Sequence, residues 1–215
     1  MVLKPRFHYA WVVVVVTFLV LLFAAGVRSI PSIIIKPLET EFGWDRGSIS
    51  FAVAISLFAY GFGGPIAGSL VDRFGPKRVM LGGLALTALG LAPMAWLTEL
   101  WQLHLLWGIV VGVGTGAIAN VLGATIANRW FNLHRGIVLG VLGASAAAGQ
   151  LLFLPSMIAL TADAGWRTTI GVIAAGVGLM LIPVLLLMRD RPQDIGLTPV
   201  GGESAAVIAK AGDEH

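Results

Sequence analysis

The sequence lacks cysteine altogether and is poor in charged residues, and these two shortages exclude several classes of protein. A chain without cysteine has no disulfide framework, no thiolate metal site and no cysteine nucleophile. Only 12% of its 215 residues are charged, whereas 57% are hydrophobic, and the mean hydropathy is +0.90. A soluble domain of this length needs a more polar surface, so the composition predicts an integral membrane protein.

Motifs for catalysis and cofactor binding are missing as well. The sequence has no cluster of ligands at metal-site spacing and no phosphate-binding loop of the kind that an ATP-driven pump needs. The run Gly143-Ala144-Ser145-Ala146 is similar to the serine motif of intramembrane proteases, but it lacks the second glycine, and no histidine lies at matching depth in another apolar run. Because a nucleophile without a base is not a catalyst, we expect no enzyme activity, no metal and no cofactor.

What the sequence does contain is a series of long apolar runs. A transmembrane helix needs about 20 predominantly apolar residues, and six runs meet that condition. They lie at about 9–35, 47–71 and 79–98, and within 100–128, 136–162 and 168–188. We therefore expect an all-α membrane protein whose residues 1–190 form a bundle of six transmembrane helices. Residues 191–215 are polar and are expected to be a cytoplasmic tail or the start of a linker.

The orientation follows from the short loop at 68–78, which joins the second and third runs. Three of its eleven residues are basic, and short loops rich in Lys and Arg stay in the cytoplasm. With this loop inside, ten basic residues are cytoplasmic and three are outside, so we expect both termini in the cytoplasm and the chain in the plasma membrane. The outer basic residues are Lys36, Arg46 and Arg167, and the outer loops are expected at 36–46, 98–103 and 161–167. Because the basic residues sit at helix ends rather than in one patch, nucleic acid is not an expected partner.

The same loop resembles the segment between helices two and three in the major facilitator superfamily, whose pattern is G-x-L-x-D-R-x-G-x-[RK]-[RK]. The matching residues are Gly68, Leu70, Asp72, Arg73, Gly75, Lys77 and Arg78. The resemblance implies a secondary transporter of twelve helices, of which this chain is the first half, built as a 3+3 inverted repeat. It also implies that the loop acts as a latch between the halves. We expect Gly68 to let two helices meet closely, Asp72 to lie at a helix N-terminus or pair with a basic residue, and Gly75 to permit the chain reversal.

A narrower resemblance covers nearly the whole chain and concerns the monocarboxylate porters and the oxalate–formate antiporters. It rests on Tyr60-Gly61, Gly63-Gly64-Pro65-Ile66, Lys36-Pro37-Leu38-Glu39, Phe42-Gly43-Trp44, Trp130-Phe131, His134-Arg135-Gly136 and Arg191-Pro192-Gln193-Asp194-Ile195-Gly196-Leu197. It implies a small organic anion as substrate, with a proton or a counter-substrate as the coupled species. The chain departs from the superfamily pattern at Gly108, where proton-driven members often carry an arginine, and in having six helices rather than twelve.

Arg28 is the only Asp, Glu, Lys or Arg well inside a predicted span. An arginine at a helix centre costs about 2.5–3.5 kcal/mol on insertion scales, so it normally faces a cavity and has a partner. Arg28 follows Gly26 and precedes Pro31, where we expect the helix to bend. Its guanidinium either binds a substrate carboxylate bidentately or extends to the outer headgroups.

Three polar residues are further candidates to line a transport path: Asn120, Tyr60 and Gln150. Each has an alternative role in packing or in hydrogen bonding between helices. Two functions therefore stand at this stage. One is the first half of a rocking transporter of a small organic anion, which needs a second six-helix half in the same chain, in a separate chain or in a homodimer. The other is a non-transporting six-helix membrane module that acts only as an assembly partner.

Overall fold

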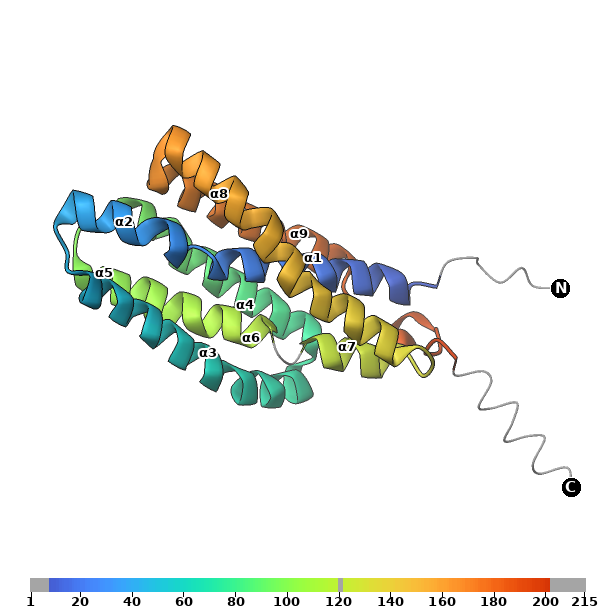
Figure 1. Ribbon diagram of the computed structural model, residues 1–215. Helices are drawn as coiled ribbons and strands as arrows, with labels where there is room; N and C mark the ends of the chain where they lie inside the picture. Colours follow the sequence, from blue (N-terminus) through green and yellow to red (C-terminus); the bar gives the residue numbers. More distant parts are fainter. Residues whose placement is uncertain (1–7, 120–121, 202–215) are drawn as a thin grey trace, which may run out of the picture.

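A computed structural model describes residues 8–119 and 122–201, and this part of the chain is helical throughout apart from turns and one isolated bridge between Phe131 and Val200 (Figure 1). The α-helices are α1 Ala10–Arg28, α2 Pro31–Phe42, α3 Arg46–Phe74, α4 Pro76–Leu91, α5 Leu100–Leu103, α6 Gly112–Ala119, α7 Leu122–Trp130, α8 Arg135–Leu179 and α9 Leu181–Leu187. The remaining helical elements are the 3-10 helices η1 Ala92–Trp96 and η3 Pro192–Ile195, and the π-helix η2 His104–Val111.

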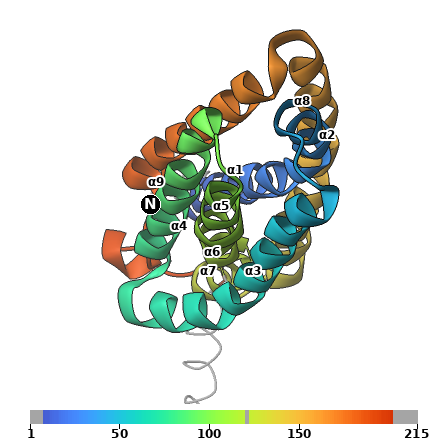
Figure 2. The same ribbon diagram turned by 90° about the vertical axis from the view of Figure 1, so that its left-hand side faces the viewer.

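Five helical stretches of the described chain are long and apolar enough to cross a membrane: Ala10–Phe42, Arg46–Phe74, Pro76–Trp96, Leu100–Trp130 and Arg135–Leu187. The sequence predicts six because its fifth and sixth runs are separated by a polar segment at 161–167. In the structure both runs fall in one stretch of 53 residues, which consists of two helices joined at a kink within that segment. Gly165 interrupts this stretch with non-helical backbone angles, φ 82° and ψ 161°. Figure 2 shows α8 folding back at this point, so that its second arm runs towards α9.

A polar contact connects the reversal of α8 to the end of α2. The Glu41 carboxylate accepts hydrogen bonds from Trp166 Nε1 at 2.9 Å and from Arg167 at 2.7 Å. The Arg167 guanidinium also lies 4.4 Å from the centroid of the Trp166 ring. The first turn after Gly165 is therefore held against the first membrane stretch.

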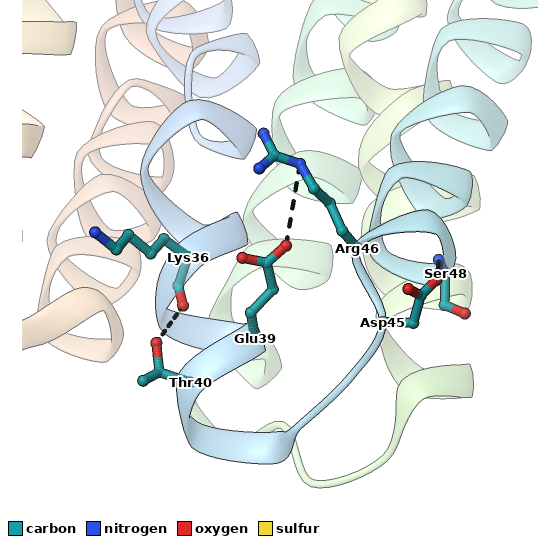
Figure 3. A network of polar contacts seen from close by, with 6 residues as sticks. All are labelled: Lys36, Glu39, Thr40, Asp45, Arg46 and Ser48. Atoms are coloured by element: carbon teal, nitrogen blue, oxygen red, sulfur yellow. Dashed lines mark hydrogen bonds and ion pairs between the residues drawn. The ribbon is translucent and has the colours of Figure 1, made fainter.

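The loop expected at 36–46 is shorter than the sequence suggests, because α2 continues to Phe42 and the turn is confined to 43–45. Gly43 takes the left-handed conformation that ends α2, with φ 66°. Asp45 then begins α3 by accepting a hydrogen bond from Ser48 N at 3.2 Å, which satisfies one of the unpaired amides of the first turn. Figure 3 shows this cap beside the Arg46–Glu39 ion pair of 4.0 Å.

Close helix packing depends on glycines at several crossings, two of which bear on the site. A Cβ built on Gly116 of α6 would lie 2.8 Å from the Tyr60 carbonyl oxygen of α3, and one on Gly149 of α8 would lie 2.9 Å from the Ala25 side chain of α1. Such approaches are possible only without a side chain, as small residues allow between membrane helices. Gly68 does not play the part expected of it, since nothing in the described chain lies within 4 Å of its Cβ position.

Candidate functional site

A cavity of about 250 Å³ opens between α1, α3 and α8. Its walls are mostly apolar, but four polar residues line it as well. These are Arg28, Tyr60, Ser145 and Gln150. The structure thus brings together two of the three substrate-binding candidates, Arg28 and Tyr60. The third, Asn120, lies outside the described residues.

Arg28 reaches the cavity because it is the last residue of α1. Regular α-helix is interrupted at Ser29 and Ile30, before Pro31 begins α2, although both residues keep right-handed helical backbone angles. The side chain is exposed, and its guanidinium Cζ lies 4.2 Å from the centroid of the Tyr60 ring. This is a cation–π contact, which engages the positive charge of arginine through the ring face.

Tyr60 is placed under Arg28 by the crossing of α3 and α6. The Tyr60 backbone lies against Gly116, where an added Cβ would be 2.9 Å from the Tyr60 Cα. The side chain is half-buried and its ring meets Arg28 across the cavity. Gly116 is therefore part of the site even though it does not line the cavity itself.

The α8 wall carries Ser145 and Gln150. Ser145 is buried and its Oγ donates a hydrogen bond to the Leu142 carbonyl at 2.5 Å, so its hydroxyl is engaged within its own helix. Gln150 is exposed to the cavity, and its neighbour Gly149 packs against α1. Of the α8 polar groups in the cavity, the Gln150 amide is thus the one positioned to meet a ligand.

The loop at 68–78 is held by a contact that the sequence does not predict. Gly75 permits the reversal between α3 and α4 with φ 85°, as predicted. The N-terminus of α4, however, is met by Asp190, whose Oδ1 accepts from Lys77 N at 2.8 Å. Lys77 Nζ donates to the Leu185 carbonyl at 2.7 Å. Asp72 was expected at such a position, but its side chain is exposed and makes no hydrogen bond or ion pair with the described residues.

The remaining latch residues lie at the surface, with Arg73 and Arg78 both exposed. The Arg73 guanidinium lies 5.2 Å from the Phe74 ring centroid. Asp190 is the residue that sequence reasoning missed. In the sequence Asp190 is a single acidic residue between two arginines, directly after the last apolar run. This pattern by itself does not indicate which helix end the carboxylate contacts.

Gly108, the position where an arginine was expected from the superfamily pattern, lies in the π-helix η2. A Cβ there would be 2.9 Å from the Ile55 side chain, so α3 occupies the space that an arginine would need. Within the residues that the structure describes, no group of three or more His, Asp or Glu side chains could hold a metal ion.

Comparison with known proteins finds relatives that are named as transporters. The chain is 26% identical over 192 residues to an uncharacterized MFS-type transporter of Bacillus subtilis, which covers 88% of this chain and 46% of that protein. It is 28% identical to human monocarboxylate transporter 7, over 88% of this chain and 37% of that protein. With the oxalate:formate antiporter of Oxalobacter formigenes it shares 25% identity, over 83% of this chain and 42% of the antiporter. The chain thus spans less than half the length of these relatives.

The fold is also that of a solved transporter. The structure of the proton:xylose symporter XylE matches with a TM-score of 0.74 at 19% identity, over 86% of this chain and 46% of the symporter. A family description of the Major Facilitator Superfamily matches residues 17–211, which is most of the sequence. The chain is therefore a member of the Major Facilitator Superfamily.

Proposed function

We propose that this chain is the N-terminal half of a secondary active transporter for a small organic anion. The observation that carries the proposal is the position of Arg28, whose charge lies in a largely apolar cavity between three helices. A guanidinium forms charge-assisted, bidentate hydrogen bonds with a carboxylate, and such pairs are stronger than hydrogen bonds between neutral groups. Monocarboxylates and oxalate, after which two of the relatives are named, are anions of this class.

The cavity gives each polar group a role. Arg28 binds the carboxylate, Tyr60 holds the guanidinium through its ring face, and Gln150 offers amide groups from the opposite wall. The volume of about 250 Å³ suits a molecule of a few heavy atoms. A second six-helix half would close the cavity, and a proton or counter-substrate gradient would supply the energy.

We infer six membrane crossings, in a 3+3 arrangement with both termini in the cytoplasm. His8 Nε2 lies 3.0 Å from the Thr198 carbonyl oxygen, so the first and last described parts of the chain meet at one end of the bundle. A chain that begins and ends on one side crosses an even number of times. The 53-residue stretch Arg135–Leu187 would be about 80 Å long if straight, against about 30 Å of hydrocarbon, and its reversal at Gly165 supplies the sixth crossing.

The anion site is tested by binding a labelled monocarboxylate to membrane vesicles that carry the protein. Losing one charge-assisted contact costs about 1.5–3 kcal/mol, so Arg28→Gln should weaken binding by about ten- to a hundredfold. Arg28→Lys keeps the charge without the planar fork and should weaken binding less. Arg46→Gln is the matched control, because Arg46 is an exposed arginine in the first turn of α3, and its loss should leave the affinity unchanged.

Two results would contradict the proposal. Unchanged affinity in Arg28→Gln would mean that this arginine only extends to the headgroups. Absence of saturable anion binding by the parent protein would favour the non-transporting membrane module.

A further inference from the structure

The segment 188–201, which follows α9, lies across the end of the bundle where the described chain begins and ends. We call this segment the clasp. From the sequence it is a polar tail or linker, yet the structure attaches it to three separate parts of the bundle. These attachments are to the end of α7, to the start of α1 and to the start of α4.

The first attachment is at Val200. Trp130 ends α7, and its carbonyl would have no partner within the helix. Val200 N donates to this carbonyl at 2.9 Å, while the Val200 carbonyl accepts from Asn132 N at 2.9 Å and from Leu133 N at 3.2 Å. The next residue, Gly201, has φ +87°, and a Cβ there would lie 2.5 Å from Leu133 Cγ. Glycine is thus required at 201 both by the backbone conformation and by the contact.

The second attachment is at His8. Its Nδ1 accepts a hydrogen bond from Ala10 N at 3.2 Å, in the first turn of α1, and its Nε2 lies 3.0 Å from the Thr198 carbonyl. An imidazole that accepts at Nδ1 and donates at Nε2 is the neutral tautomer with its hydrogen on Nε2. One side chain therefore binds the start of α1 and the clasp at once.

The third attachment is at Asp190, whose carboxylate accepts from Lys77 N in the first turn of α4. An acid at this place also complements the positive end of the helix dipole. The chain between Asp190 and Val200 is stiffened by Pro192 and Pro199, and by a turn in which Arg191 N donates to Asp194 at 3.0 Å. A stiff connection of this kind transmits a displacement at one end to the other.

From these contacts we propose that the clasp is one cooperative unit, which holds the ends of α1, α4 and α7 together so that the bundle moves as a single body. Its three attachments form together and break together, so that loss of one also releases residues 75–78 from Asp190. The device does not depend on which substrate is carried, so it can be tested apart from transport.

Hydrogen exchange of single amides measures the clasp directly in the full chain in detergent. Gly201→Ala should speed exchange about tenfold or more at the amides of Val200, Asn132 and Leu133, and also at Lys77, which is far from the substitution in sequence. Gly43→Ala is the matched control. Gly43 has φ +66° with nothing within 4 Å of its Cβ position, in the turn between α2 and α3, so it carries the same backbone strain without touching the clasp.

The reverse experiment starts from the other end. Asp190→Ala removes the acceptor for Lys77 N and should speed exchange at Val200, whereas Asp190→Asn keeps an oxygen acceptor and should leave both amides protected. Amides in the middle of α1 should stay slow in every variant, since the clasp touches only the helix ends. If Gly201→Ala affects only residues near 130–133 and 200, and Asp190→Ala affects only Lys77, the attachments are independent and the proposal is overturned.

Discussion

At the scale of single residues, the sequence shows which charged residues are unusual, but it does not show which residues they contact. Arg28 stands out because an arginine in an apolar run is expensive, and the structure places it in a cavity. Its contact with Tyr60 depends on how α1 and α3 are placed on either side of the cavity, and no local pattern encodes that placement. Asp190 was missed for the same reason, since its partner Lys77 is 113 residues away in the chain.

Gly116 is the glycine on which the geometry of the site depends most, because its lack of a side chain lets α3 and α6 approach each other. Gly116→Ala should force α3 away from α6 and move Tyr60 relative to Arg28, because the new Cβ would lie 2.8 Å from the Tyr60 carbonyl oxygen. Overpacking of this kind costs about 1–3 kcal/mol, which lowers the melting temperature by about 2–4 °C for each kcal/mol. Thermal unfolding in detergent, together with anion affinity, should show both losses.

Gly140→Ala provides the comparison for Gly116→Ala. Gly140 is helical, and nothing lies within 4 Å of its Cβ position. Alanine is the better helix former by about 0.5–1 kcal/mol, so this variant should be as stable as the parent or slightly more stable. Equal melting temperatures for the two variants would argue against a tight α3–α6 crossing.

At the scale of helices, the apolar runs predict where helices lie but not where they end. Polar residues at 36–46 predicted a loop, yet Lys36 and Glu39 lie on α2. At 161–167 the chain does reverse, but the reversal is confined to Gly165 and Thr161 still lies on α8. Helical hydrogen bonding does not stop where apolar character stops, because a helix that leaves the hydrocarbon can continue in water. The π-helix His104–Val111 could not be predicted from the sequence either, since its residues are as apolar as their neighbours.

Gly165 is the residue that turns one long helical stretch into two arms. Its angles, φ 82° and ψ 161°, fall in a region that is nearly reserved for glycine, so Gly165→Ala should cost about 1–3 kcal/mol. Gly171→Ala, in the same stretch and with nothing within 4 Å, should have no such effect. The measurement is the midpoint of thermal unfolding in detergent, and a Gly165→Ala protein as stable as the Gly171→Ala protein would show that the reversal does not depend on glycine.

At the scale of the whole molecule, large apolar side chains are abundant on the outside. Leu151 is 78% exposed, Phe58 69% and Leu89 69%. A soluble protein avoids so much exposed apolar surface, whereas a bundle in lipid or against a second half requires it. Composition alone predicted this membrane character, and the fold of the superfamily accounts for it.

The path of the chain through the membrane is open to direct test, because the sequence has no cysteine and single cysteines are unambiguous reporters. The positions chosen are exposed: Thr98 after η1, Ala164 beside the reversal of α8, and Gln193 in the clasp. A membrane-impermeant thiol reagent is applied to intact, right-side-out cells. With six crossings and both termini inside, Thr98→Cys and Ala164→Cys should be labelled, and Gln193→Cys should be labelled only after the membrane is opened.

Each alternative arrangement gives a different pattern. If the stretch Arg135–Leu187 crossed only once, Gln193→Cys would react from outside and Ala164→Cys would be shielded in the bilayer. If the orientation were reversed, Gln193→Cys would react and Thr98→Cys would not. The expected pattern follows from two independent facts: basic residues concentrate in the loops assigned to the cytoplasm, and the His8–Thr198 contact requires an even number of crossings. Labelling of Gln193→Cys together with Thr98→Cys and Ala164→Cys in intact cells would place the clasp outside and contradict the arrangement with six crossings.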